Sequence, residues 1–120
     1  MVQSLPLPLD AAFAALADAT RRGVLERLAR ADASITALAA QFGLTLTGMR
    51  KHVRVLEAAG LVVSEKRGRV RTCRVSGQGL EAAAAWIEAQ RQIWEARFGQ
   101  LDALVGELKK EQDNGHKRDE

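Results

Sequence analysis

The sequence has little of what builds disulfides, membrane anchors or secretion signals. Its 120 residues include one cysteine, Cys73, which excludes an intramolecular disulfide and fits a reducing compartment. No apolar run approaches the roughly 20 residues that a membrane helix needs. Residues 1–9 lack the basic start and small-residue cleavage site of a signal peptide. We therefore expect a soluble, cytoplasmic protein without a membrane partner.

Residues for catalysis and metal binding are scarce as well. The chain has two histidines, His52 and His116, and it contains no Ser/His/Asp or Cys/His arrangement. It also lacks a glycine-rich phosphate loop and a carboxylate pair spaced for acid–base chemistry. Four-coordinate zinc needs three or four good ligands within reach, and no such cluster is present. We predict no enzyme, no catalytic residue, no metal site and no cofactor.

The positive charge is concentrated in one quarter of the chain. Overall the protein is 47% hydrophobic and 28% charged, which is typical of one globular domain. Residues 45–75 hold eight basic and two acidic side chains, a net of +6, whereas residues 1–44 are balanced and residues 76–120 carry −3. A basic segment of this kind is expected where a protein contacts nucleic-acid phosphates.

The spacing of apolar residues predicts four short helices in the first half of the chain. They cover about residues 9–17, 18–29, 36–42 and 46–59. Asp18, Thr36 and Thr45 have side chains suited to N-caps for the last three of these helices.

The third and fourth helices have the features of a helix-turn-helix. Gly43 allows the tight turn between them, and Gly60 ends the fourth helix. Met49, Val53 and Leu56 share one face of that helix and are expected to be buried.

A hairpin and a long helix follow. Residues 61–64 and 70–75 are rich in β-branched side chains and flank a basic, glycine-containing tip at residues 66–69. The expected last helix, residues 77–110, has no proline and carries an apolar residue every seventh position from Leu80 to Leu108. At about 1.5 Å per residue it is roughly three times as long as the radius of gyration of a domain this size.

Such a helix needs a partner, and a twofold dimer is the simplest closed solution. The alternative is that its tryptophans, Trp86 and Trp94, fill the core of their own chain. The predicted dimerisation residues are Trp94, Phe98, Leu101, Leu104, Val105 and Leu108.

The predicted fold is therefore mostly α with a small β-hairpin, in the order α-α-α-α-β-β-α. This is a winged helix-turn-helix with a long C-terminal dimerisation helix. We expect one DNA-binding domain over residues 1–110, which includes the dimerisation helix at 77–110, and a disordered polar tail at 111–120.

The fourth helix is the candidate recognition helix. Small residues at its N-terminus allow close approach to base edges, Arg50 and Arg54 suit bidentate contacts to guanine, and Lys51 and His52 suit phosphates. An ordinary solvated face would mix charges, yet no acid lies between Gln41 and Glu57. Which residues read bases stays open. The predicted contacts in this helix are Thr45, Thr47, Gly48, Arg50, Lys51, His52 and Arg54.

The basic hairpin is the candidate wing. Lys66, Arg67 and Arg69 suit a neighbouring minor groove or phosphates. Arg71 and Arg74 fit flanking phosphate contacts or simple solvation of an edge strand equally well. The predicted wing contacts are Lys66, Arg67, Arg69 and Arg71.

Residues 16–28 (LADATRRGVLERL) and 49–62 (MRKHVRVLEAAGLV) resemble the arsenic-repressor (ArsR/SmtB-type) family. The resemblance extends over nearly all of residues 9–110. It implies a dimeric repressor that leaves operator DNA when an effector binds. It also implies a recognition helix at 46–59 and a wing at 62–75.

The sequence departs from the metal-sensing members of that family. Where they often carry Cys-x-Cys, the matching positions here are Ser34 and Thr36, whose hydroxyls are poor ligands for soft ions. Other members carry His and carboxylate pairs on the last helix, but residues 76–110 contain no histidine. The resemblance is therefore to the metal-independent branch. We expect Cys73 to be a packed residue, the alternative being a redox sensor.

These observations favour a homodimeric repressor that binds a palindromic operator in double-stranded DNA with sequence specificity. One alternative is a metal- or redox-responsive repressor. Another is a winged-helix protein-interaction module, which would have a recognition helix of mixed charge. The sequence predicts neither the operator nor an effector.

Overall fold

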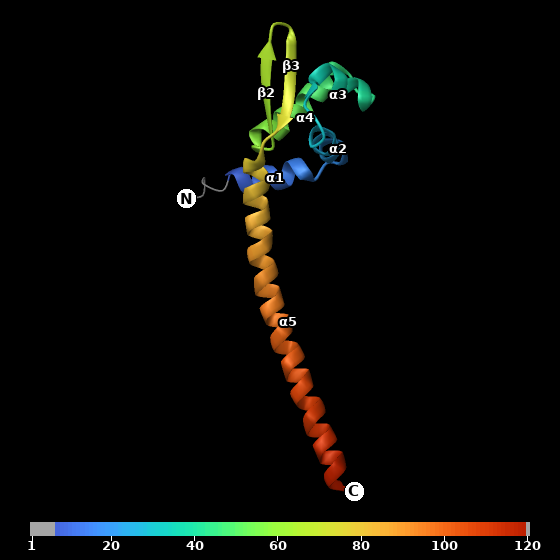
Figure 1. Ribbon diagram of the computed structural model, residues 1–120, viewed down its shortest axis with the longest axis vertical. Coiled ribbons are helices and arrows are strands. Elements are labelled where there is room, and N and C mark those ends of the chain that lie inside the picture. The colour runs from blue at the N-terminus through green and yellow to red at the C-terminus, as the bar shows by residue number, and fades with distance from the viewer. Residues whose placement is uncertain (1–6, 120) are drawn as a thin grey trace. The chain divides into compact units, whose positions relative to one another are not determined.

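The predicted fold class is confirmed, with a sheet that has one strand more than expected. The computed structural model describes residues 7–119, and the side chains of residues 9–112. Figure 1 shows the elements in order along the chain. They are α1 (Leu7–Leu16), α2 (Ala19–Leu28), β1 (Ala33–Ser34), α3 (Ile35–Gln41), α4 (Leu46–Ala58), β2 (Val62–Arg67), β3 (Val70–Val75) and α5 (Gly77–Asp119).

The chain forms two compact units, residues 1–84 and residues 85–120. The first contains α1 to α4, the sheet and the first turns of α5. The second consists of the remaining length of α5.

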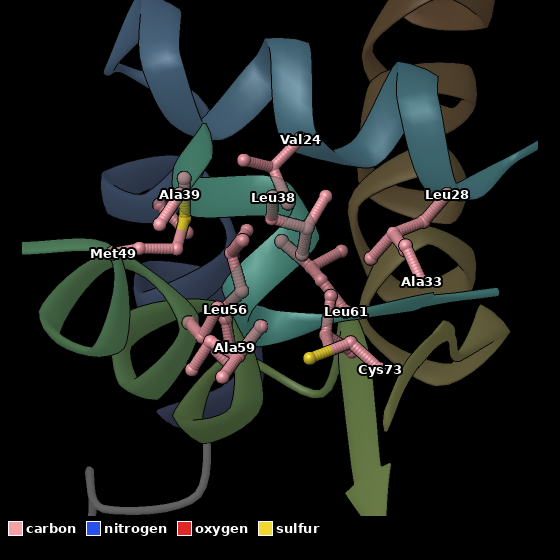
Figure 2. Packing of buried hydrophobic residues seen from close by; sticks show 14 residues of the cluster. Val24, Leu28, Ala33, Leu38, Ala39, Met49, Leu56, Ala59, Leu61 and Cys73 are labelled. Atoms are coloured by element: carbon pink, nitrogen blue, oxygen red, sulfur yellow. The ribbon is translucent and has the colours of Figure 1, made fainter. Parts of the chain in front are cut away.

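The core of the first unit lies where the helix-turn-helix meets the sheet. Leu38 from α3, Leu56 from α4 and Leu61 after α4 are fully buried together with Cys73 from β3. Figure 2 shows these side chains gathered in one cluster. Met49 and Val53 belong to the same cluster, so the predicted buried face of α4 is confirmed.

Two of the three predicted N-caps are confirmed. The Asp18 carboxylate accepts from the backbone N–H of Arg21 at 3.0 Å, and the Thr45 hydroxyl accepts from that of Gly48 at 3.0 Å. The prediction for α3 was wrong, because Ser34 and not Thr36 caps it by accepting from Ala37 N at 3.0 Å.

The short strand β1 explains that error. Ala33 pairs with Cys73 and Ser34 with Thr72, so the sheet has the antiparallel order β1-β3-β2. The chain therefore reaches Ser34 in an extended conformation, and α3 begins directly after it. A strand of two residues is too short for an alternating pattern to reveal it.

The wing has a longer first strand and a tighter tip than predicted, while its second strand lies at residues 70–75 as predicted. The β2–β3 register runs from Val62 opposite Val75 to Arg67 opposite Val70. The turn is therefore Gly68 and Arg69, and Lys66 and Arg67 lie in β2. Gly68 has a φ of +62°, whereas Arg69 has no positive φ, which fits a two-residue turn with glycine at its first position.

The start of α5 packs closely on the end of α4. The backbone N–H of Gly79 donates to the carbonyl of Gly60 at 2.9 Å. A Cβ atom at Gly79 would lie 2.3 Å from the carbonyl oxygen of Ala59. Only glycine fits there, because no L side chain tolerates so short a contact with backbone.

The last helix extends further than predicted. Instead of ending near Lys110 it continues to Asp119. Residues 107–112 include Glu, Leu, Lys and Gln, which favour helix, and no proline follows them. Helix thus replaces the predicted tail up to Asp119, while residues 1–6 and Glu120 lie outside the described residues. No helix within residues 7–119 is long and apolar enough to cross a membrane.

Candidate nucleic-acid interface

The outer face of α4 presents most of the predicted recognition residues to solvent. Thr45, Thr47, Arg50, Lys51 and Arg54 are exposed, whereas Gly48 and His52 are half-buried. The Thr45 oxygen already accepts the capping bond, but its hydroxyl proton remains available for donation. The N-terminal turn of α4 is therefore small, polar and accessible, as reading base edges requires.

A cationic cleft lies between the helix-turn-helix and the wing. It has a volume of about 460 Å³ and is walled by α3 and α4 on one side and by β2, the turn and β3 on the other. Glu57 is the one acid among the residues that line it. The cleft brings together five predicted contacts from two separate segments of the sequence: Arg50, Arg54, Lys66, Arg69 and Arg71.

A chain of hydrogen bonds links the two walls of this cleft. The Ser64 hydroxyl in β2 donates to Oε2 of Glu57 in α4 at 2.6 Å. Nη1 of Arg71 in β3 donates to the same Ser64 oxygen at 3.0 Å. The Arg71 guanidinium is thus held toward the cleft. Sequence reasoning missed Glu57 and Ser64, because nothing in their spacing indicates that one hydroxyl joins three elements.

The strand pleat places Arg71 and Arg74, whose roles the sequence left undecided, on opposite sides of the sheet. Arg71 lines the cationic cleft, whereas Arg74 lies in a separate hollow of about 150 Å³ with the acids Asp32 and Glu65. Residues three apart on a strand face opposite sides of the sheet. The surface around Arg71 thus suits phosphate, and that around Arg74 is balanced in charge.

Most cations of the cleft have no competing partner. Within the described residues, the side chains of Arg50, Arg54, Lys66 and Arg69 take part in no hydrogen bond or salt bridge. The predicted wing contact Arg67 does not line this cleft; it lies with Arg74 in the smaller hollow. There it pairs with Glu65 at 2.9 Å, but both side chains are more than half exposed, so that pair contributes little. These guanidinium and ammonium groups are therefore free to meet phosphate oxygens.

His52 differs from its neighbours on α4 because its ring turns toward α2. Its Nδ1 lies 3.4 Å from Nη1 of Arg21 and 3.9 Å from Oδ2 of Asp18. The capping bond from Arg21 N holds the pKa of Asp18 below its ordinary value, and the charges of Arg21 and His52 lower that pKa further. Sequence reasoning found Asp18 only as a cap and placed Arg21 on the outer face of its helix without a role.

The residues at the family's metal positions do not fit a metal ion. The Ser34 hydroxyl accepts the α3 capping bond, and Thr36 lines the cationic cleft. Among the described residues no three His, Cys, Asp or Glu side chains are close enough to hold one ion. Cys73 is fully buried in the core, as predicted, and this burial raises the pKa of its thiol, as does the nearby charge of Glu57.

The predicted dimerisation residues, on α5, are exposed within the single chain. Trp94 is 63% exposed and Leu101 49%. Trp86, the other tryptophan, is 48% exposed. Arg91 lies between the apolar residues Ile87 and Trp94 in the sequence. It forms salt bridges with Glu88, at 2.7 Å, and with Glu95. The side chains that share this exposure are Trp94, Phe98, Leu101, Leu104, Val105 and Leu108.

Comparison with known proteins points to transcriptional regulators. A helix-turn-helix domain model matches residues 16–65. The HTH-type transcriptional regulator Rv2034 of Mycobacterium tuberculosis is 36% identical over 73 residues, which make up 61% of this chain and 68% of that relative.

Two solved structures share the fold. The ArsR family transcriptional regulator RHA00566 is 42% identical, with a TM-score of 0.71, and the match covers 79% of this chain and 97% of that one. The homodimeric winged helix-turn-helix domain Mb0332 from Mycobacterium bovis is 24% identical, with a TM-score of 0.56, over 70% of this chain and 80% of that one. At that lower identity the second match speaks for the fold alone.

Proposed function

The chain belongs to the ArsR family of winged helix-turn-helix transcriptional regulators, which bind DNA and are not enzymes, and on this premise we propose that it is a homodimeric repressor of a palindromic operator. The observation that carries the proposal is the cationic cleft between α4 and the wing. It contains five basic side chains and one acid, a surface that would attract the DNA backbone at the edge of the groove that α4 enters. We place the protein in the cytoplasm, together with the chromosome.

The proposed contacts divide by chemistry. Thr45, Thr47 and Gly48 approach base edges at the start of α4, while Arg50 and Arg54 make bidentate contacts to guanine. The remaining proposed contacts meet phosphates or the adjacent minor groove: Lys51 and His52 from α4, and Lys66, Arg67, Arg69 and Arg71 from the wing.

The dimer is proposed from the apolar row on α5. Six large apolar side chains from Trp94 to Leu108 stay about half exposed or more within one chain. A second copy offers the same row, so a twofold axis would cover both at once. Twofold symmetry implies two half-sites about one DNA turn apart, and hence a palindrome.

The repressor is proposed to work without the metal site of many relatives. Ser34, Thr36 and the buried Cys73 offer no open thiolate or imidazole set. Equilibrium dialysis with zinc, cadmium or arsenite tests this. Negligible binding is expected, and tight stoichiometric binding would favour a metal-responsive repressor instead.

The deciding experiment is fluorescence anisotropy with DNA from upstream of the protein's own gene, against a scrambled duplex of equal length and composition. We expect a preference of about a thousandfold or more at near-physiological salt, and an affinity that falls steeply as salt rises. Equal, weak binding to both duplexes would contradict regulation at that site. No binding at low salt would favour a protein-interaction module.

A further inference from the structure

His52 connects the proposed recognition helix to the junction of α1 and α2. Its side chain is 25% exposed and lies against the start of α2. One ring nitrogen, Nδ1, faces both Arg21 at 3.4 Å and Asp18 at 3.9 Å. Within the described residues the other nitrogen, Nε2, has no hydrogen-bond partner.

The Arg21 guanidinium is fixed before it meets the ring. Its Nε donates to the carbonyl of Ala15 at 2.9 Å, and its Nη2 donates to that of Ala14 at 3.0 Å. Both carbonyls belong to the last turn of α1, where backbone donors run out, although that of Ala14 also accepts from the backbone N–H of Ala17 at 3.3 Å. The third nitrogen, Nη1, is then the one turned toward His52. Because the guanidinium group is planar and rigid, its two bonds to α1 also set the position of Nη1 relative to α4.

These partners determine which ring nitrogen carries the proton. A guanidinium only donates hydrogen bonds, so a neutral His52 must accept at Nδ1 and carry its proton on Nε2. If the ring becomes doubly protonated, the Asp18 carboxylate is the acceptor that Nδ1–H faces. In both states Nδ1 stays toward α2, and Nε2–H remains a donor.

We propose that Arg21 and Asp18 are positioning residues for DNA binding, which hold the His52 ring so that Nε2–H donates to a DNA phosphate oxygen. Neither positioning residue contacts the DNA itself. The inference rests on the proposed function, because it needs α4 to lie against duplex DNA. It adds that the orientation of one phosphate contact is set by the α1–α2 junction.

Arg22 provides a matched control. Its Nη1 donates to the carbonyl of Leu16 at 2.8 Å, so it too holds the end of α1, but it has no contact with His52. Arg21→Ala and Arg22→Ala each remove one positive charge and one anchor of α1. We expect Arg21→Ala to weaken binding to a mixed-sequence duplex by about fivefold or more, and Arg22→Ala by less than about twofold.

The same assay tests whether Arg21 acts through the ring. His52→Ala is expected to lose as much affinity as Arg21→Ala, and the double variant to lose no more than either alone. His52→Gln carries an amide N–H near the position of Nε2 and should recover most of the lost affinity. If Arg21→Ala does not fold, Arg21→Lys replaces it, because an ammonium keeps the charge but cannot span two carbonyls and a ring.

Nitrogen-15 NMR of the imidazoles gives a readout that loss of stability would not mimic. The chain has two histidines, and His116→Gln assigns their signals. In the free wild-type protein we expect the Nε2–H tautomer at His52, and in folded Arg21→Ala a mixture of both tautomers. A neutral wild-type ring that carries its single proton on Nδ1 would overturn the proposal, and so would equal losses of affinity in Arg21→Ala and Arg22→Ala.

The proposed function and the role of His52 can each fail without the other. If the wild-type chain binds no duplex, the proposed function fails, whereas the tautomer of the free protein still decides whether Arg21 orients the ring. If duplex binding is strong but His52→Ala leaves it unchanged, the proposed function stands and the phosphate contact from His52 is wrong.

Discussion

The proposed recognition helix α4 and the second unit of the chain carry apolar residues at similar helical spacing, and the chain buries only those of α4. Met49 and Leu56 in α4 are fully buried by α3, the sheet and the other helices of the first unit. Ile87 and Trp94 in α5 are 50% and 63% exposed. Helical periodicity thus predicts that a face will be covered, but it does not say by which molecule.

The difference has an energetic meaning. Large contiguous apolar surfaces are uncommon on monomeric proteins, because each square ångström of apolar area removed from water stabilises the folded or associated state by about 25 cal/mol. The core of the first unit obtains this contribution from its own chain at any concentration. For α5 it would come from association, so it depends on protein concentration.

The largest expected effect comes from placing a charge in the exposed row. Leu101→Glu should shift the dimer–monomer equilibrium by at least about a hundredfold, because an unpaired charge within an interface costs about 3–5 kcal/mol. Sedimentation velocity measures the shift, and operator affinity should fall with it. Ala103→Glu adds the same charge off the row and serves as the control. If Leu101→Glu sediments as the wild type does, the interface lies elsewhere.

Truncation in the core of the first unit should have a large effect of another kind. Leu56→Ala removes a fully buried side chain and should lower the free energy of unfolding by about 2–5 kcal/mol. Val55→Ala, at a half-exposed position on the same helix, should cost less than about 1 kcal/mol. Urea unfolding followed by circular dichroism measures both. Similar losses for the two variants would contradict the assigned buried face of α4.

Removing a base contact should have a smaller effect that leaves stability alone. Arg50→Ala or Arg54→Ala should cost about 1–3 kcal/mol of operator affinity and relax specificity at one base pair. Lys66→Ala should weaken all duplexes about equally, since it removes a phosphate contact. Fluorescence anisotropy with operator and scrambled duplexes separates the two patterns. If both arginine variants keep full specificity, α4 is not the reading element.

The smallest expected effect is a pH dependence in the first unit. The pKa of Asp18 is lowered in the folded chain, so its carboxylate stabilises the fold above the unfolded pKa of about 4. That contribution disappears as the pH falls through the lower, folded pKa. Thermal unfolding of the wild type should therefore weaken more steeply in acid than that of Asp18→Asn, which keeps an N-cap but does not titrate. Parallel curves would contradict this role of Asp18.

The sequence predicted the elements of the first unit well where the cause is local. The caps at Asp18 and Thr45 are confirmed, as is the buried face with Met49 and Leu56, since an N-cap acts over three residues and a helix face repeats every three or four. Local signals failed for β1, because its two residues take their strand geometry from pairing with β3. The end of α5 was misplaced for a related reason, since a change in polarity does not stop a helix without a breaker such as proline.

The candidate site divides in the same way. The order of residues alone determined that the positive charge is concentrated in residues 45–75. The 3.6-residue period determined which side chains of α4 stay outside. Only the tertiary structure decided that Arg71 joins the cleft through Ser64 and Glu57 while Arg74 does not, and that His52 turns toward Arg21 and Asp18. The physical reason is range. Periodicity and capping act within one or two helical turns, whereas these contacts join residues that meet only after the core has brought α1, α2, α4 and the wing together.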